Sequence, residues 1–383
     1  MSLRKIGKGI LLISIEVLFF ILFIVFMETN QTGSVGALLL VFIAIGFLFK
    51  TWKSANRALT GLFREMKILA TVGFILLLLS LPFVFRTSPY LIHICVMAGL
   101  YAILALGLNF QLGSTNVVNF ATAASYGIGA YASALFAVHY HFPFWIGIFI
   151  GGGFASLFGL ILGFPCMKTK DYYLSLVTIA FGLIIYLLLI NFSWTGGPNG
   201  ISNIPAPSLG SHSFRDPLNL FGFQLPFHSN YFYLIFLLVG GALLVAYRLH
   251  QSRVGLTWNA IREDEIAARC QGIDVTWYKI LAFCIDAFFG GVTGTVYAHY
   301  IGFISPENFA FIVSVVVVTM VVLGGMDNVF GVIIGAILLT ILPEKFRAFE
   351  DFRLLIYGVI VVMMLMFRPQ GLIPQKLRVY QKG

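Results

Sequence analysis

Acidic side chains that could do chemistry inside an apolar environment are rare in this chain. Asp286 and Glu16 fall within long apolar runs, and each stands alone. Catalysis in a water-poor site usually needs paired carboxylates, a histidine cluster or a nucleophile next to its base. Asp286 is therefore expected to bind an ion, to be neutralised by a partner or to be protonated, and Glu16 to lie near an interface. The pattern does not favour a membrane-embedded enzyme.

The sequence predicts neither a metal site nor a cofactor. His93 and His299 fall near the predicted outer ends of apolar runs, where water reaches. The chain also lacks the GxxxxGK[ST] sequence that holds nucleotide phosphates. We therefore expect this chain to catalyse no reaction of its own.

A group of polar side chains within apolar surroundings could line a route for a solute. Polar groups at membrane depth must be satisfied by protein, water or substrate. Hydrogen bonding between helices is the alternative, and at any single position it is the commoner case. The candidate path residues are Asn109, Gln111, Asn116, Asn119, Thr122, Ser125 and Tyr126.

The charged segment Arg253–Val275 could bind a soluble partner. Residues 258–269 predict one helix, because alanine and isoleucine favour helix and three acidic residues lie towards its N-terminal half. Gly272 suits the position that follows a helix. A small surface at Ala267 and Ala268 permits close docking, although an ordinary solvated helix would look alike. The candidate docking residues are Arg262, Glu263, Asp264, Glu265, Ile266, Ala267, Ala268 and Gly272.

The elements that position these residues are predicted by composition. Hydrophobic residues make up 59% of the chain and charged residues 10%. A soluble domain with this composition could not cover its surface with polar side chains. We predict an all-α polytopic membrane protein with about 10–12 crossings. The expected spans are Ile10–Met27, Gly33–Phe49, Ile68–Phe85, Leu91–Leu112, Val117–Val138, Phe144–Phe164, Tyr173–Phe192, Tyr231–Tyr247, Ile280–Phe303, Phe309–Leu323, Phe330–Leu342 and Leu354–Phe367. The last three of these before the C-terminus are short, so some are expected to be tilted, broken or re-entrant.

Basic residues predict the orientation. The net charge of +9 could suggest nucleic acid, but in a membrane protein it indicates anchors on the cytoplasmic face. With both termini in the cytoplasm, 19 of the 24 Lys and Arg residues lie inside. The exceptions are Arg86, Arg215, Lys345, Arg347 and Arg353.

Loops and small residues complete the expected organisation. Residues 193–230 are predicted to form an external loop and residues 248–279 a cytoplasmic one, with a tail at 376–383. Glycines four residues apart, such as Gly147 with Gly151 and Gly290 with Gly294, predict closely crossing helices. The segments 112–117 and 324–329 are weakly similar, a pattern typical of transporters built from two halves.

Several of these segments resemble one family. Ala267, Ala268 and Gly272 match the Glu-Ala-Ala, three residues, Gly motif of ABC importer permeases, with Ile266 in place of the motif glutamate. More closely, the chain resembles the LivM-type permeases of branched-chain amino-acid ABC transporters. The segments that carry this resemblance are 107–113, 127–131, 195–201, 260–268, 272–275, 297–303, 305–307 and 367–372. It covers about 91–372; residues 1–90 look like added accessory helices before a core at 91–375. The stretch Ser114–Phe120 departs from the family pattern, so substrate choice is expected to differ.

The resemblance implies a division of labour. A LivM-type subunit works with a second, related permease, two cytoplasmic ATPases and an external substrate-binding protein. ATP, bound by the ATPases, would move a coupling helix in the cytoplasmic loop and drive alternating access in a bacterial inner membrane. The expected substrates are branched-chain or similar hydrophobic amino acids. The alternatives are urea, short amides or another small polar solute, or an ion-coupled secondary transporter.

Overall fold

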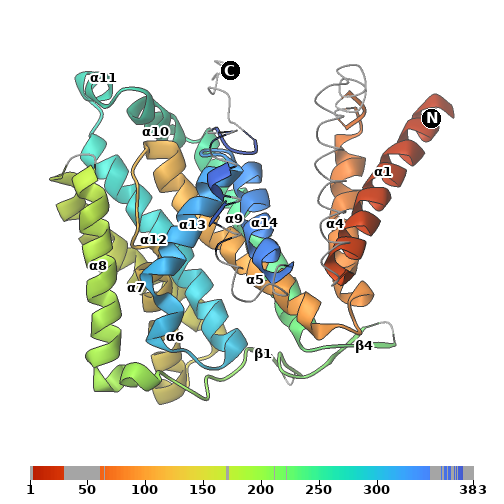
Figure 1. Cartoon of the computed structure of the whole chain (residues 1–383), viewed down its shortest axis with the longest axis horizontal. Coiled ribbons are helices and arrows are strands. Elements are labelled where there is room, and N and C mark those ends of the chain that lie inside the picture. The colour runs from red at the N-terminus through yellow and green to blue at the C-terminus, as the bar shows by residue number, and fades with distance from the viewer. Residues whose placement is uncertain are drawn as a thin grey trace.

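The computed structural model shows a bundle of helices (Figure 1). It describes residues 3–29, 61–63, 65–169, 172–210, 212–220 and 222–345, with isolated positions from 355 to 373. The long helices are α1 (Leu3–Glu28), α4 (Lys67–Val84), α5 (Pro89–Leu108), α6 (Thr122–Tyr140), α7 (Phe144–Met167), α8 (Tyr172–Asn191), α9 (His228–Gln251), α12 (Val275–Ile301), α13 (Phe311–Gly324) and α14 (Val329–Lys345).

Short elements connect the long helices. A π-helical turn, η1 (Asn109–Gly113), continues α5, and α10 (Arg253–Glu263) and α11 (Glu265–Cys270) link α9 to α12. The remaining 3-10 turns are η2 (Ser193–Thr195), η3 (Gly197–Asn199) and η4 (Pro306–Phe309). Two antiparallel hairpins pair β1 (Ser208–Leu209) with β2 (His212–Ser213) and β3 (Leu218–Leu220) with β4 (Phe223–Leu225).

Eight helical segments of the described residues are long and apolar enough to cross a bilayer. Helices α6 and α14 pack among them, which agrees with an all-α polytopic membrane protein. The predicted span Gly33–Phe49 and half of Leu354–Phe367 lie outside the described residues. Helix α13 is short, with 14 residues, as expected for this region.

Helix α12 occupies the centre, where it crosses α6 and α7. Close approach depends on glycine: a Cβ on Gly151 of α7 would meet the carbonyl oxygen of Gly129 at 2.8 Å and that of Gly291 at 3.3 Å. Such contacts let helix backbones touch, which is how small residues join helices in lipid. The glycine spacing in the sequence therefore corresponds to real close crossings.

One predicted span begins later than expected. We expected a helix from Val117, but α6 begins at Thr122, and residues 116–121 are not helical. The Asn119 side-chain oxygen accepts a hydrogen bond from the Ala121 N–H at 2.8 Å, a local turn that competes with helix. Thr178 of α8 accepts from the Phe120 N–H at 3.1 Å, so protein satisfies this irregular backbone.

The segment that follows α8 and the end of α12 are held together by hydrogen bonds. Ile201 and Ile304 exchange backbone hydrogen bonds of 2.9 and 3.0 Å. Nearby, His299 is 1% exposed, so the expectation that water reaches it is wrong. Its ring nitrogens lie 2.9 Å from Ser133 Oγ and 2.6 Å from the Pro205 carbonyl oxygen. His299 thus fastens the loop to the bundle.

Candidate functional site

Helix α10 is fixed to the bundle by a buried tryptophan. Trp258 is fully buried, and its indole N–H donates a hydrogen bond of 2.9 Å to the Tyr278 carbonyl oxygen. Its ring lies 6.2 Å from that of Phe110 in η1, measured between centroids. Because a buried tryptophan contributes a large apolar contact area, α10 is held firmly against η1.

An ion pair adds a second attachment. Arg262 Nη1 of α10 lies 3.1 Å from Asp327 Oδ2, in the turn between α13 and α14. The Asp327 side chain is only 2% exposed. Its other oxygen accepts a 2.8 Å hydrogen bond from the Ser114 hydroxyl, and its backbone N–H donates to Asn109 Oδ1 at 2.8 Å. We call Asn109, Ser114, Arg262 and Asp327 the Asp327 node.

The predicted single helix over 258–269 is wrong, because Asp264 divides it. Asp264 has extended backbone angles, φ −157° and ψ 108°, and its carboxylate accepts from the N–H groups of Ile266 and Ala267 at 2.9 and 3.0 Å. This is an N-cap, for which aspartate is a preferred residue. A new helix, α11, therefore starts after Asp264. Gly272, with φ +82°, follows its end as predicted.

Helix α11 presents a small, mostly exposed face. Ile266 is 76% exposed and Ala267 is exposed, whereas Ala268 is buried against the bundle. Glu263, just before the cap, is also exposed. Of the candidate docking residues, Arg262 and Ala268 thus point towards the protein, and Ile266 and Ala267 point away from it.

Glu265 ties α11 to α12. Its carboxylate lies 2.5 Å from Lys279 Nζ and 2.8 Å from Arg269 Nη2. Partial burial raises the pKa of Glu265, but the hydrogen bonds and charges of Lys279 and Arg269 outweigh it and hold the pKa below the usual 4.5. Glu265 is therefore a fixed anion at neutral pH, and α11 is braced at its first turn.

Two of the candidate path residues, Gln111 and Asn119, meet at a buried carboxylate. Asn119 Nδ2 donates to Asp286 Oδ2 at 2.8 Å and lies 3.1 Å from Gln111 Oε1. We call Gln111, Asn119 and Asp286 the polar cluster. All three are buried, and Asp286 Oδ1 and Gln111 Nε2 have no hydrogen-bond partner within the described residues. Buried polar groups are seldom left unpaired, so this cluster is unusual.

The other candidates lie apart from this cluster. Thr122, Ser125 and Tyr126 are buried along α6, with Ser125 packed against Gly290 and the Tyr126 ring 5.0 Å from that of Phe309. Asn116 is exposed with φ +55° and belongs to neither the node nor the cluster. That these residues line a translocation path stays a prediction.

Sequence reasoning missed Asp327 as a functional candidate. The signal was present in the similarity between segments 112–117 and 324–329, since these two segments meet in the Asp327 node. The segment 367–372 also reaches this place, because the Leu372 N–H donates to the Leu323 carbonyl oxygen at 2.8 Å. Segments separated along the sequence therefore converge on one turn.

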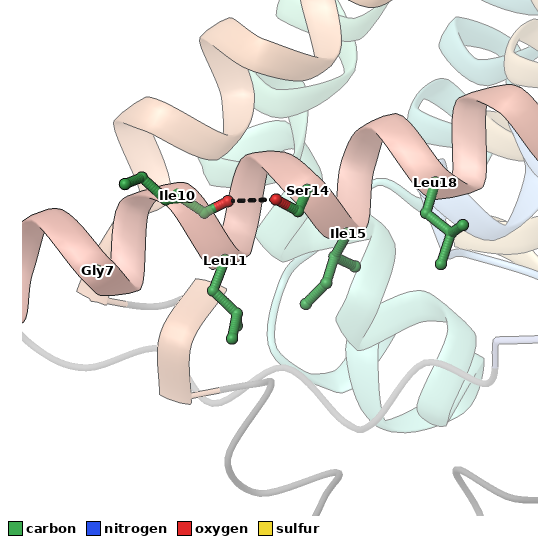
Figure 2. Close-up of a pocket in the computed structure, with 6 residues that line it drawn as sticks. All are labelled: Gly7, Ile10, Leu11, Ser14, Ile15 and Leu18. Atoms are coloured by element: carbon green, nitrogen blue, oxygen red, sulfur yellow. Dashed lines mark hydrogen bonds between the residues drawn. The ribbon is translucent and has the colours of Figure 1, made fainter.

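A hollow on the surface of α1 lies away from this site. The shallow hollow drawn in Figure 2 is formed by α1 alone, and its one polar side chain, Ser14, bonds the Ile10 carbonyl oxygen at 2.9 Å. Ile10 and Leu18 are exposed apolar residues there, as on a lipid-facing surface. Within the described residues, no group of three or more His, Cys, Asp or Glu could hold a metal ion.

Comparison with known proteins shows the family of this chain. Residues 90–367 match the family model of the branched-chain amino acid transport system permease component. The chain is 40% identical to the high-affinity branched-chain amino acid transport system permease protein LivM of Escherichia coli (strain K12), over 78% of this chain and 73% of that protein. Identity to a probable LivM of Methanocaldococcus jannaschii is 25%, over 73% and 91% of the two chains.

A second group of permeases is more distant. The chain is 23% identical to the high-affinity branched-chain amino acid transport system permease protein LivH of Escherichia coli (strain K12), over 71% of this chain and 91% of that protein. No solved structure matches. On the family model and the 40% identity together, this multi-pass membrane protein belongs to the LivM-type family of branched-chain amino-acid permeases.

Proposed function

We propose that this chain is the membrane-spanning permease subunit of an ABC importer that carries branched-chain or similar hydrophobic amino acids inward. Two cytoplasmic ATPase subunits bind and hydrolyse ATP, and this chain hydrolyses nothing. A second, related permease subunit completes the path, and an external binding protein delivers substrate. The membership of the chain in the LivM-type family supports this proposal.

The observation that carries the proposal is the construction of α10 and α11. A docking element has to be accessible on one side and firmly attached on the other. A loosely attached helix would move by itself and would not transmit the movement of the ATPases to the bundle. Helix α11 offers Ile266 and Ala267 to a partner, and α10 is held by Trp258 and Arg262. The exposed apolar side chain of Ile266 suits a shallow apolar groove on an ATPase.

The orientation we propose places α10 and α11 in the cytoplasm of a bacterial cell, below its inner membrane. These two helices lie at the same end of the bundle as the start of α1, at the top of Figure 1, and the β-hairpins lie at the opposite end. Both termini are proposed to be cytoplasmic, on the side with most basic residues. The external binding protein would then approach the end that carries the hairpins.

Reconstitution tests the proposal. Proteoliposomes that contain both permeases and the ATPases, supplied with binding protein, should take up radiolabelled leucine only when ATP reaches the ATPases. Omitting the ATPases should abolish uptake while this chain still inserts. Uptake driven by a proton or sodium gradient without ATP would contradict the ABC assignment.

One substitution tests the docking surface itself. Ala267→Arg places a long charged side chain on the exposed face of α11 and should block co-purification of the ATPases with a folded permease. Ala267→Ser, which adds a single atom at the same position, is the matched control and should assemble normally. Normal assembly and transport in Ala267→Arg would refute the docking role.

A further inference from the structure

One carboxylate joins the proposed docking loop to the interior of the bundle. Asp327 bonds α10 through Arg262 at 3.1 Å and the end of η1 through Ser114 at 2.8 Å. Its backbone N–H adds a third bond, of 2.8 Å, to Asn109 at the start of η1. With the Asp327 side chain 2% exposed, water has little access to replace these partners.

The turn that carries Asp327 is braced on its other side. The Leu372 N–H donates to the Leu323 carbonyl oxygen at 2.8 Å, and the Asn328 side chain donates to the Ile373 carbonyl oxygen at 3.1 Å. A Cβ on Gly113 would meet Asp327 Cα at 2.9 Å, so η1 and this turn lie in backbone contact. They are therefore expected to move as one body.

The π-helical turn η1 connects this node to the polar cluster. Asn109 belongs to the node, and two residues later Gln111 belongs to the cluster with Asn119 and Asp286. Single π-turns within α-helices often mark functional sites, because their wider turn is less regular and can rearrange. A displacement of α10 therefore either moves η1, and with it the cluster, or separates Arg262 from the buried carboxylate of Asp327.

We propose that Arg262 and Asp327 are positioning residues that transmit the movement of α10 to η1 and so to the polar cluster. Without their ion pair, the ATPases still dock and hydrolyse ATP, but hydrolysis no longer drives uptake efficiently. This inference rests on the proposed function, since it takes α10 and α11 as the place where the ATPases act. It identifies the residues that couple ATPase docking to uptake.

The test measures leucine taken up per ATP hydrolysed, in proteoliposomes that hold the complete transporter with its binding protein. Arg262→Gln and Asp327→Asn should each lower this ratio about tenfold, a common size for coupling between sites, and leave ATP hydrolysis nearly unchanged. Asparagine tolerates positive φ, so Asp327→Asn removes the charge without straining the backbone at φ +66°. Arg262→Lys, which keeps the charge, should restore most of the ratio.

Arg253→Gln is the matched control. Arg253 is an exposed arginine at the start of the same helix, so this change removes one positive charge from α10 without touching Asp327. The double variant Arg262→Gln/Asp327→Asn should be no worse than either single variant, because both remove one interaction. A ratio in Arg262→Gln and Asp327→Asn equal to that of Arg253→Gln would overturn the proposal.

Two further results keep the test decisive. If Arg262→Gln yields no assembled complex, the deciding variant is Ser114→Ala, which leaves both charges in place. A severalfold lower uptake ratio in Ser114→Ala would support the transmission of movement through Asp327. An unchanged ratio would overturn it. Failure of the proposed function would look different, since Ala267→Arg would then assemble normally. If only the role of Arg262 and Asp327 is wrong, Ala267→Arg should still fail to bind the ATPases, and the Arg262 and Asp327 variants should have a normal uptake ratio.

Discussion

Arg262 of α10 and Asp327 of the turn between α13 and α14 form an ion pair of 3.1 Å across the boundary between a surface loop and the helix bundle. Surface ion pairs contribute little to stability, but this one has a nearly fully buried acidic partner. It therefore fixes α10 to one place in the bundle. Helix α11 is attached through Glu265 instead, and it exposes Ile266 and Ala267.

The cap of α11 should be essential to the docking face. Asp264→Ala removes the acceptor for the Ile266 and Ala267 N–H groups and should destabilise α11 by about 1 kcal/mol. Hydrogen exchange at Ile266 and Ala267 should accelerate accordingly. Asp264→Ser, which preserves an N-cap oxygen, is the control. Equal exchange in the alanine and serine variants would show that the cap does not hold this helix.

The anchoring of α11 should depend on pH in one direction. Because the pKa of Glu265 is below 4.5 in the folded loop, its ion pairs stabilise the loop at higher pH. The stabilisation should be complete above 4.5 and should fade as the pH falls through the lowered pKa. The protection of α11 amides from hydrogen exchange, taken relative to the intrinsic exchange rate at each pH, should thus stay constant from neutral to mildly acidic pH and fall below that range.

Glu265→Gln provides the comparison for this pH effect. The variant lacks the titrating carboxylate, so its α11 amides should be less protected at neutral pH and should lose less protection on acidification. An unchanged acid response in Glu265→Gln would mean that another group anchors the loop.

The helix crossings should tolerate no added methyl group at their contact points. Gly151→Ala would bring a Cβ to 2.8 Å from the Gly129 carbonyl oxygen and should cost about 1–3 kcal/mol. Gly153, on the same helix, has nothing within 4 Å, so Gly153→Ala should be harmless. Thermal unfolding of the detergent-solubilised protein compares the two. Similar melting temperatures would argue against tight packing of α7 on α12.

A leucine substitution in the polar cluster should destabilise the protein more than the same substitution at an exposed asparagine. Asn119→Leu removes the donor shared by Gln111 and Asp286 and leaves buried acceptors unpaired, at a cost of about 1–3 kcal/mol. Asn191→Leu, the same change at an exposed site on α8, is the control. If the cluster belongs to the route, leucine uptake per folded transporter should also fall in Asn119→Leu alone. Equal uptake in both variants would place the route elsewhere.

The helical architecture could be predicted because lipid leaves few alternatives: long apolar runs must close their backbone hydrogen bonds within helices. The positions at which helices are interrupted were harder to predict. The interruption at 116–121 and the division at Asp264 depend on single side chains, Asn119 and Asp264, that bond nearby backbone in preference to helix. Asparagine and aspartate often do this, but sequence does not say at which position.

The pairing of Arg262 with Asp327 could not be predicted, because it joins two loops far apart in the chain. Only the three-dimensional packing of α10 on η1 brings them together. The sequence predicts the candidate docking residues as one surface of a single helix. The structure separates them into inward residues, such as Arg262 and Ala268, and outward residues, such as Ile266 and Ala267.

The most direct test of the docking role is photo-crosslinking from Ile266, which is 76% exposed on α11. A p-benzoylphenylalanine placed there, in the assembled transporter in native membranes, should crosslink to an ATPase subunit. The same probe at Leu209, which is exposed in β1 at the opposite end of the bundle, should not. A crosslink from position 266 to the external binding protein, or none to an ATPase while transport runs normally, would contradict the account.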